Sequence, residues 1–573
     1  MTPNRLIVAC AALLIASCAP TSSVRQSAAP PAPRATGVQS FVIAANPLAA
    51  KAGMDVLEQG GNAIDAAIAV QAMLSLVEPQ SSGLGGGAIM QHLDGVTGKL
   101  EVYDGRERAP AQASPAMFLG PDGKPLGFRE AVVSGRATGV PGVVAALSLA
   151  HREHGRLPWR DLFGAAIQTA DEGFIISPRL GRFLPQPFPQ LEGPDAKRYF
   201  SKPDGTRMAT GDRLRNPEYA AFLSRLARDG ADALYRGSTA AQIVARTRQA
   251  PLEGSMTMAD LAEYRPTKRV PICAPYRGYK VCAPPPPSSG VGLLALLGLL
   301  ERTDIAARGP NDPLAWFLFA EASRLMYADR DTYVGDADFV KVPVAGMIDP
   351  TYLDQRAALI GTFAAAKVDP GKPAGASVAI TDRTLEPAGT SHFIVRDSRG
   401  NVVSMTTTVE SIFGSGRMVD GFFLNNQMTD FSFDPFMADG APSPNAVAPR
   451  KRPRSSMVPL VLFDSEGHFA GAIGSAGGNA ILAYVGKSLV GAIDWNLPMQ
   501  QALALPNLVA RGNNFNGEMS KFSPELLSGL AARGMTLKPG QGEDSGVHGV
   551  MIRAGKVDGG FDPRREGVVL LGP

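Results

Sequence analysis

The chain has 573 residues, of which 45% are apolar and 19% charged, and its formal net charge is +3. This length and composition suit a large folded core, built either as several domains or as one continuous unit. The small net charge gives no support for nucleic-acid binding or for a polybasic membrane contact. We therefore expect the densest basic run, Lys-Arg-Pro-Arg at residues 451–454, to be a solvated loop.

The beginning of the chain has the pattern of an export signal. An apolar run too short to span a bilayer is followed by Ile15-Ala16-Ser17-Cys18. Cys18 occupies the position of the lipidated cysteine of bacterial lipoproteins, so residues 1–17 are expected to be a signal peptide. The protein would then face the periplasm, tethered to the outer membrane by lipid on Cys18. Cleavage nearby and release into the periplasm is the alternative. Residues 18–38, rich in Pro, Ala and Ser, are expected to form an unfolded tether.

Helical patterns dominate the first part of the chain and strand patterns the last. A helix is predicted over 47–58, ending at Gly60-Gly61, and Asn62 can cap a second helix to about residue 75 with Asp65 three positions on. Further helices are predicted at 141–154, 159–172, 238–248, 291–302 and 312–329. Strands are predicted near 99–104, 279–283, 392–396, 402–408, 420–424, 457–463 and 469–473. This order suits a layered fold of sheets and helices.

Two cysteines lie beyond the signal region, Cys273 and Cys282. A two-residue turn at Arg277-Gly278 would pair Tyr276 with Tyr279 and, further out, the two cysteines with each other. A disulfide is expected in an oxidising compartment, and two buried free thiols are the alternative.

The most informative segment follows Gly389. A strand beginning at Thr390 and one ending at Thr408 flank a turn at residues 397–401. If Asp397 faces Asn401 across the loop, Thr390 lies opposite Thr408, close enough for one hydroxyl to orient the other. This suits a threonine that becomes a nucleophile when the chain is cut before it and its freed amine acts as the base. A strand threonine without a chemical role and a register shifted by a bulge are the alternatives.

Several separated motifs, in order along the chain, resemble the γ-glutamyltransferase family of N-terminal-nucleophile hydrolases over about residues 42–565. They are Gly60-Gly61-Asn62-Ala63-Ile64-Asp65-Ala66-Ala67, Leu84-Gly85-Gly86-Gly87, Gly105-Arg106-Glu107, Pro285-Pro286-Pro287-Ser288-Ser289-Gly290, Tyr327-Ala328-Asp329-Arg330, Gly389-Thr390-Ser391-His392, Leu424-Asn425-Asn426-Gln427-Met428-Thr429-Asp430-Phe431-Ser432, Lys451-Arg452-Pro453-Arg454-Ser455-Ser456-Met457 and Gly477-Gly478.

The resemblance implies an α+β fold, the four-layer αββα sandwich of the N-terminal-nucleophile hydrolase type. It also implies a precursor that cuts itself between Gly389 and Thr390. The products would be a large chain of residues 39–389 and a small catalytic chain of residues 390–573, which stay associated. No cofactor is implied.

The resemblance also assigns roles to residues. Thr390 would be the nucleophile, oriented by Thr408, and the backbone of Gly477-Gly478 would stabilise the oxyanion. The substrate-binding residues would be Arg106, Ser455 and Ser456 for a carboxylate, and Glu410, Gln427 and Asp430 for an ammonium group. By residue type alone, a plain turn at the glycines and ordinary surface ion pairs are the alternatives. Position 410 is Asn in many relatives, so Glu410 makes this amine pocket more acidic. His392 is expected to be structural.

The implied function is that of a γ-glutamyltransferase and glutathione hydrolase. It would cleave a glutathione-like γ-glutamyl amide through an acyl-enzyme on Thr390 and pass the glutamyl group to water or to an amino acid or peptide. The rivals are a glutaryl- or cephalosporin-type acylase of the same fold and a non-catalytic lipoprotein that binds glutamyl compounds. No metal site is indicated, because His151 and His154 lack metalloprotease spacing. Residues 83–87 lack a nucleotide-loop pattern and are expected to allow close backbone packing. Between Asp430 and Ser455 the chain is a few residues shorter than in relatives that carry a lid with a Tyr, and residues 434–449 contain no Tyr. Coverage of the bound glutamyl group is therefore expected to be incomplete.

Overall fold

The computed structural model describes residues 38–377, 382, 384, 386–437, 440, 442–540 and 545–572. The predicted signal peptide, Cys18 and all but the last residue of the predicted tether lie outside the described residues. Within them, no helix combines the length and the apolar character needed to cross a membrane.

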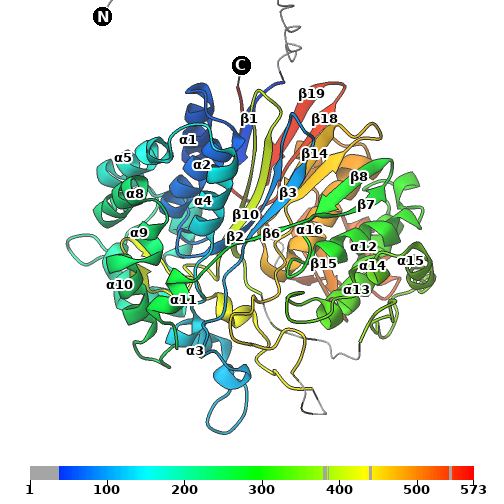
Figure 1. The fold of residues 1–573 in the computed structure, drawn as a ribbon. Helices are drawn as coiled ribbons and strands as arrows, with labels where there is room; N and C mark the ends of the chain where they lie inside the picture. Colours follow the sequence, from blue (N-terminus) through cyan, green and yellow to red (C-terminus); the bar gives the residue numbers. More distant parts are fainter. Residues whose placement is uncertain are drawn as a thin grey trace, which may run out of the picture. The chain divides into compact units, whose positions relative to one another are not determined.

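Two large sheets form the centre of the fold (Figure 1). The first contains, in spatial order, β20 (Val568–Leu571), β1 (Phe41–Ala44), β9 (Gly389–Arg396), β10 (Val402–Glu410), β2 (Gly87–Leu93), β3 (Leu100–Gly105) and β6 (Thr267–Arg269). The second contains β19 (Lys556–Phe561), β18 (His548–Arg553), β14 (Phe469–Gly474), β13 (Leu460–Phe463), β8 (Tyr279–Ala283) and β7 (Ile272–Tyr276).

Helices cover the outer faces of both sheets, so the molecule has four layers (Figure 1). The first sheet is covered by α1 (Pro47–Glu58), α2 (Ala63–Val77) and α4 (Val143–His154), with α5 (Gly164–Glu172) and α8 (Pro217–Asp229) packed outside them. The second is covered by α12 (Gly290–Glu301) and α16 (Ile481–Leu489), with α13 (Pro313–Tyr333) packed against α12. The remaining helices are α3 (Phe128–Val132), α6 (Pro178–Phe183), α7 (Pro194–Tyr199), α9 (Asp232–Tyr235), α10 (Gly237–Thr247), α11 (Met258–Ala262), α14 (Val344–Met347), α15 (Pro350–Ala357), α17 (Met499–Ala504) and α18 (Pro524–Ala531). The short strands are β4 (Phe174–Ile175), β5 (Arg213–Leu214), β11 (Met418–Val419), β12 (Phe422–Phe423), β15 (Leu508–Arg511), β16 (Asn514–Gly517) and β17 (Lys538–Pro539).

The alternation of side chains along β9 shows how the layers are built. Phe393 and Val395 pack into the core between the first sheet and its helices, whereas Ile394 packs into the core between the two sheets. Successive strand residues point to opposite faces, so a strand covered on both sides places apolar residues in two cores, as these three neighbours do. The predicted αββα sandwich is therefore the observed fold.

Most predicted elements are present with shifted ends. The capping box of Asn62 and Asp65 begins α2, and predicted helix 159–172 starts as a 3-10 turn over Trp159–Phe163 before α5. Predicted strand 420–424 is reduced to β12, and predicted strand 457–463 begins only at Leu460.

The hairpin β9–β10 has the predicted register. Thr390 lies opposite Thr408, and the backbone N–H of Asp397 donates to the carbonyl oxygen of Asn401 at 3.0 Å across the loop. The register shifts only beyond Thr408, where Glu410 pairs with Gly389. The bulge therefore lies at the end of the hairpin that carries Thr390, not in its loop.

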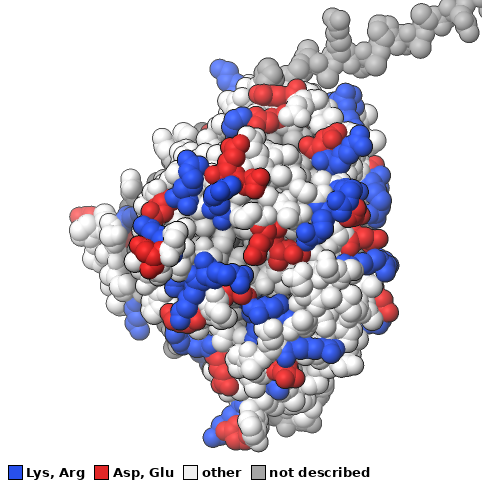
Figure 2. Space-filling view, turned by 90° about the vertical axis from the view of Figure 1, so that its left-hand side faces the viewer, with Lys and Arg blue, Asp and Glu red and all other residues white. Residues whose placement is uncertain are grey.

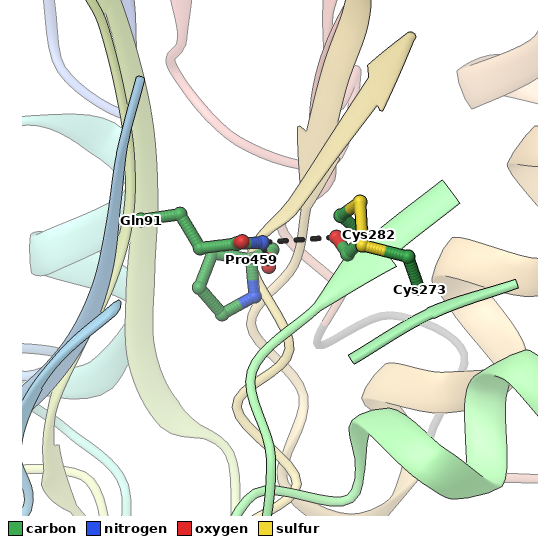
Figure 3. The surroundings of a disulfide bond; sticks show 4 residues. All are labelled: Gln91, Cys273, Cys282 and Pro459. Atoms are coloured by element: carbon green, nitrogen blue, oxygen red, sulfur yellow. Dashed lines mark hydrogen bonds between the residues drawn. A yellow bond between two sulfur atoms is a disulfide. The ribbon is translucent and has the colours of Figure 1, made fainter. Parts of the chain in front are cut away.

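Hairpin β7–β8 pairs Cys273 with Cys282, and their sulfur atoms form a disulfide. Gln91 of β2, in the other sheet, points toward this hairpin (Figure 3). Its side-chain amide donates to the carbonyl oxygens of Cys282 at 3.0 Å and Pro459 at 2.6 Å. A buried polar side chain thus links the two sheets beside the disulfide. On the face shown in Figure 2, acidic and basic side chains are interspersed.

Candidate active site

Thr390 and Thr408 lie side by side at the buried end of the β9–β10 hairpin. Their Oγ1 atoms are 3.0 Å apart, and the Thr408 hydroxyl donates to the carbonyl oxygen of Gly389 at 2.7 Å. A hydroxyl has one proton, so the proton between the two threonines belongs to Thr390. The N–H of Glu410 donates to Thr408 Oγ1 at 2.8 Å. Thr408 therefore holds both the Thr390 hydroxyl and the carbonyl that precedes it.

Glycines allow the backbone to come this close. A Cβ on Gly389 would lie 2.3 Å from the carbonyl oxygen of Ser411, and one on Gly86 would lie 2.0 Å from that of Thr408. These distances are too short for any side chain, so the expectation of close packing at residues 83–87 is confirmed at Gly86. Gly477 and Gly478 both have positive φ, +131° and +55°, and follow the end of β14.

One pocket brings together every predicted catalytic or substrate-binding residue except Gly477. Its lining is Arg106, Glu386, Pro387, Thr390, Thr408, Glu410, Gln427, Asp430, Ser455, Ser456, Met457, Gly478 and Ile481. The residues come from the loop after β3, the segment before β9, the β9–β10 hairpin and the 3-10 turn Gln427–Asp430. The loop before β13, the loop after β14 and the first residue of α16 supply the rest. Segments that lie up to several hundred residues apart in the sequence thus converge on Thr390.

The amine-binding candidates carry oxygen atoms that lack a donor. Asp430 Oδ2 accepts from Arg106 and from Gln427, whereas Asp430 Oδ1 and Gln427 Oε1 have no hydrogen-bond partner. Glu410 Oε2 accepts from Ser411 and Asn426, whereas its Oε1 accepts from no donor. When Glu410 is protonated, it can instead donate to the neighbouring Asp430. These three buried acceptor oxygens lie in one pocket, next to the guanidinium of Arg106. The arrangement suits a ligand that carries an ammonium group close to a carboxylate.

The carboxyl groups of this pocket titrate abnormally. Burial and the neighbouring Asp430 raise the pKa of Glu410 well above its ordinary value. Burial also raises the pKa of Asp430, against the effect of Arg106. Outside the pocket lining, burial raises the pKa of Glu107, the neighbour of Arg106 in sequence, to about 8. Glu410 therefore keeps its proton more readily than Asp430, which is paired with Arg106.

Ser455 and Ser456 are held by the Pro-Pro-Pro-Ser-Ser-Gly segment. The Ser455 N–H donates to the carbonyl oxygen of Pro287, and the Ser455 carbonyl accepts from both the N–H and the hydroxyl of Ser289, all at 2.8 Å. Arg330 donates to the Ser289 hydroxyl at 2.9 Å and to the Ser456 hydroxyl at 2.6 Å. The motif near Pro285 thus fixes a segment that lies about 170 positions later in the sequence.

The basic run at residues 451–454 is not a solvated loop, and that prediction was wrong. Lys451, Arg452 and Arg454 are 3%, 4% and 0% exposed. Arg454 contacts the carboxylates of Asp382 at 3.1 Å and Glu386 at 3.3 Å. Lys451 donates to two backbone carbonyls, and burial lowers its pKa to about 8. Acidic partners from distant segments explain the burial, and sequence spacing gives no sign of them.

Sequence reasoning missed three charged residues next to the pocket: Glu386, Arg330 and Arg454. Arg330 and Arg454 belong to motifs of the sequence but had no predicted role, and Glu386 belongs to none of the motifs. All three are buried charged residues, and their burial can be recognised only in the folded structure.

The histidines do not join the pocket. His392 is fully buried, its Nδ1 is 2.9 Å from the hydroxyl of Thr406, and burial followed by the nearby His548 lowers its pKa well below the ordinary value. This neutral, packed state agrees with a structural role. Elsewhere, His92, Glu101 and His154 bring potential metal-ligand atoms within 4.8 Å of one another, and Glu101 also pairs with Lys99 and Lys268. The sequence did not predict this cluster, because its members come from β2, β3 and the end of α4.

Comparisons with known proteins agree with this geometry. The family described as gamma-glutamyltranspeptidase matches residues 49–572. The glutathione hydrolase proenzyme of Bacillus subtilis (strain 168) is 35% identical over 93% of this chain and 92% of its own length. The acylase ACY 1 proenzyme of Pseudomonas sp. (strain SE83) is 35% identical over 87% of each chain. The crystal structure of a cephalosporin acylase from Bacillus halodurans superposes with a TM-score of 0.80 at 26% identity, covering 95% of this chain and 98% of that one. The chain belongs to the γ-glutamyltranspeptidase family.

Proposed function

We propose that the protein is a self-cleaving γ-glutamyltransferase and glutathione hydrolase. It takes a glutathione-like γ-glutamyl amide as donor and transfers the glutamyl group to water or to the amine of an amino acid or peptide. Family membership and the relatives named glutathione hydrolase proenzyme support the activity. No step requires a cofactor.

The observation that carries the proposal is the set of three unpartnered acceptor oxygens on Glu410, Gln427 and Asp430. An α-ammonium group has three N–H donors, one for each of these oxygens. The neighbouring guanidinium of Arg106, with the Ser455 and Ser456 hydroxyls, provides donors for the α-carboxylate. In the structure Arg106 and Asp430 pair with each other. A zwitterionic donor would replace this internal ion pair with two charge-assisted contacts.

Maturation begins when Thr390 Oγ1 attacks the carbonyl carbon of Gly389. The C–N bond between Gly389 and Thr390 breaks as the nitrogen gains the hydroxyl proton, leaving an ester on Oγ1. Water hydrolyses that ester, which leaves a carboxylate on Gly389 and a free hydroxyl and α-amine on Thr390. Thr408 supports the first step, because its hydroxyl donates to the Gly389 carbonyl oxygen.

Turnover uses the same hydroxyl on a new carbonyl. The freed Thr390 amine removes the Oγ1 proton, and Oγ1 attacks the γ-carbonyl carbon of the donor. The N–H groups of Gly477 and Gly478 stabilise the oxyanion, and the leaving amine departs with a proton. Water or an acceptor amine then attacks the ester and restores Thr390.

An acylase that acts on glutaryl or cephalosporin amides is the second candidate, and the ACY 1 relative supports it. A glutaryl group carries no ammonium, so it would leave the acceptors of Asp430 and Gln427 without donors. Unpaired buried acceptors are costly, and this favours the glutamyl donor.

The experiment compares γ-glutamyl and glutaryl anilides in wild type, Asp430→Asn and Asp430→Ala. Loss of a desolvated charged contact costs on the order of 2–5 kcal/mol, so kcat/KM for the glutamyl donor should fall by roughly thirtyfold or more. The glutaryl donor should be affected far less. Because Asp430 also pairs with Arg106, a denaturing gel must show that each variant is cut. Equal losses on both donors, or a wild type that prefers the glutaryl donor, would replace this proposal with the acylase.

We further propose that Cys18 carries a lipid anchor that holds the protein in the outer membrane, facing the periplasm. The sequence Ile-Ala-Ser-Cys after an apolar run supports this. Labelled palmitate should be incorporated into wild type and not into Cys18→Ala, which should appear in the soluble periplasmic fraction. A soluble, unlabelled wild type would favour simple cleavage.

A further inference from the structure

The buried guanidinium of Arg454 has both of its acidic partners on the segment just before the cleavage site. Asp382 contacts Arg454 at 3.1 Å and Glu386 contacts it at 3.3 Å. Arg454 itself is fully buried. A buried charge needs a partner of opposite sign, because removal of that partner leaves it uncompensated at high cost. Arg454 is therefore compensated by two carboxylates on the segment that ends at Gly389. Cleavage after Gly389 would release the end of this segment.

Glu386 is also bound by two further donors of the site. Arg330 donates to Glu386 Oε1 at 2.7 Å, and the Ser456 hydroxyl donates to Oε2 at 2.5 Å. Burial alone would raise the pKa of this carboxyl, but Arg330 and Arg454 lower it to about 2. The carboxylate is thus ionised and gripped in the way that proteins bind a ligand carboxylate.

The backbone next to Glu386 runs against the proposed oxyanion site. The N–H of Asn479 donates to the Glu386 carbonyl oxygen at 3.1 Å, and a Cβ on Gly478 would lie 1.8 Å from that oxygen. Glu386 and Pro387 both line the pocket that contains Thr390. In the uncut chain, Glu386 and Pro387 therefore occupy space in the pocket that a γ-glutamyl donor would need.

We propose that Arg330, Arg454 and Ser456 form a carboxylate site that Glu386 fills before cleavage and that the α-carboxylate of the donor fills afterwards. Before the cut, Glu386 is a positioning residue. Its anchored carboxylate, three residues before Gly389, holds the scissile carbonyl against Thr390 and Thr408. After the cut, departure of the segment leaves Arg454 without a carboxylate and opens the site to the donor. The second half rests on the function proposed above. It adds Arg330 and Arg454 to Arg106, Ser455 and Ser456 as the donors to the α-carboxylate.

The first test measures self-cleavage in vitro. Glu386→Ala should slow the appearance of the two fragments by about tenfold or more, because the scissile segment loses its anchor. Added acetate, which can fill the vacated carboxylate place, should restore much of the rate, whereas acetamide of the same shape should not. Glu321→Gln is the matched control, since Glu321 is a buried glutamate that pairs with Arg324 on α13, away from the pocket. It should cleave at the wild-type rate.

Three outcomes would overturn the positioning role. They are cleavage of Glu386→Ala at the wild-type rate, equal effects of acetate and acetamide, and equal slowing in Glu321→Gln. The last would mean that any lost buried carboxylate slows cleavage. Acetate should also raise the melting temperature of Thr390→Ala/Glu386→Ala and leave that of Thr390→Ala unchanged. This readout needs no cleavage at all.

The second test addresses the donor. Per cut chain, Arg454→Met should raise KM for a γ-glutamyl anilide by about tenfold or more, because a charged contact is lost. KM for the 4-aminobutyryl anilide, which keeps the ammonium but lacks the α-carboxylate, should be unchanged. Equal effects on both donors would remove Arg454 from the site. If the proposed function itself is wrong, wild type will not hydrolyse the γ-glutamyl donor. This result is distinct from a change in KM that affects both donors equally.

Discussion

At the scale of single residues, Thr408 uses its whole hydrogen-bonding capacity around the proposed cleavage site. It accepts from Thr390 and from the Glu410 N–H and donates to the Gly389 carbonyl. Thr408→Val keeps the shape of the side chain but removes all three contacts. Loss of one donor to a developing oxyanion costs about 10²–10³ in rate, so self-cleavage should slow by at least that factor. Thr408→Ser, which keeps the hydroxyl, should recover most of the rate on a time course followed by denaturing gel. A valine variant that cleaves normally would exclude Thr408 from the mechanism.

The raised pKa of Glu410 predicts a pH dependence of donor binding. An ammonium group binds best to the ionised carboxylate, whereas the free site favours the protonated form. Donor binding therefore releases a proton, and kcat/KM of wild type relative to Glu410→Gln should increase as pH rises toward the raised pKa. The folded state also binds this proton more tightly than the unfolded state does. The free energy of unfolding of wild type should thus fall relative to Glu410→Gln over the same range. A constant ratio and a constant difference across pH would contradict this assignment.

The sequence predicts some of these residues and not others for physical reasons. Thr390 faces Thr408 because a short loop and the two-residue period of strands determine the register. Glu386, Arg330 and Arg454 could not be found in this way. Their ion pairs join segments 56 and 68 positions apart, and their burial depends on the complete fold. A basic run without nearby acidic residues is normally exposed to solvent, so residues 451–454 were predicted to form a solvated loop. The prediction was wrong because carboxylates from distant segments compensate the buried charge.

At the scale of elements, the segment before β2 contacts the end of β10 that carries Thr408. Gly86 precedes β2, and a Cβ there would lie 2.0 Å from the Thr408 carbonyl oxygen. Gly86→Ala should therefore displace β10 at Thr408, lower the stability by about 1–3 kcal/mol and slow self-cleavage. Gly83→Ala is the control, because its nearest neighbour would be the Ser75 hydroxyl oxygen at 3.3 Å. Thermal unfolding and the cleavage time course would both be measured. Equal behaviour of the two variants would show that this contact does not position Thr408.

The same scale shows why some elements escaped prediction. Helices with clear caps, such as α1 and α2, were located well from sequence. Strands β1 and β2 are buried at every position, so they lack the alternation that marks a half-buried strand. Turn residues located the hairpins β9–β10 and β7–β8, whereas the pairing of β1 with β20 from the other end of the chain has no local signal.

At the scale of the whole molecule, the proposed cut separates two chains that share both sheets. In the first sheet, β1 of the large chain lies between β20 and β9 of the small chain, and β10 of the small chain pairs with β2 of the large chain. The second sheet joins β13, β14, β18 and β19 to β7 and β8. The interface resembles a protein core more than a contact between two surfaces.

The cut protein should therefore behave as one particle. Size-exclusion chromatography without denaturant should elute both chains together at the size of the precursor, and only denaturant should separate them. Elution of a free small chain under native conditions would contradict the shared-sheet arrangement.

The central claim, that Thr390 becomes the N-terminal nucleophile by cutting the chain before itself, has one direct test. Mass spectrometry and N-terminal sequencing of purified protein should find a fragment that begins at Thr390, and purified Thr390→Ala should remain a single chain without γ-glutamyl transfer or hydrolysis. A wild type that is active while uncut, a fragment that begins at another residue, or normal cleavage of Thr390→Ala would contradict the claim.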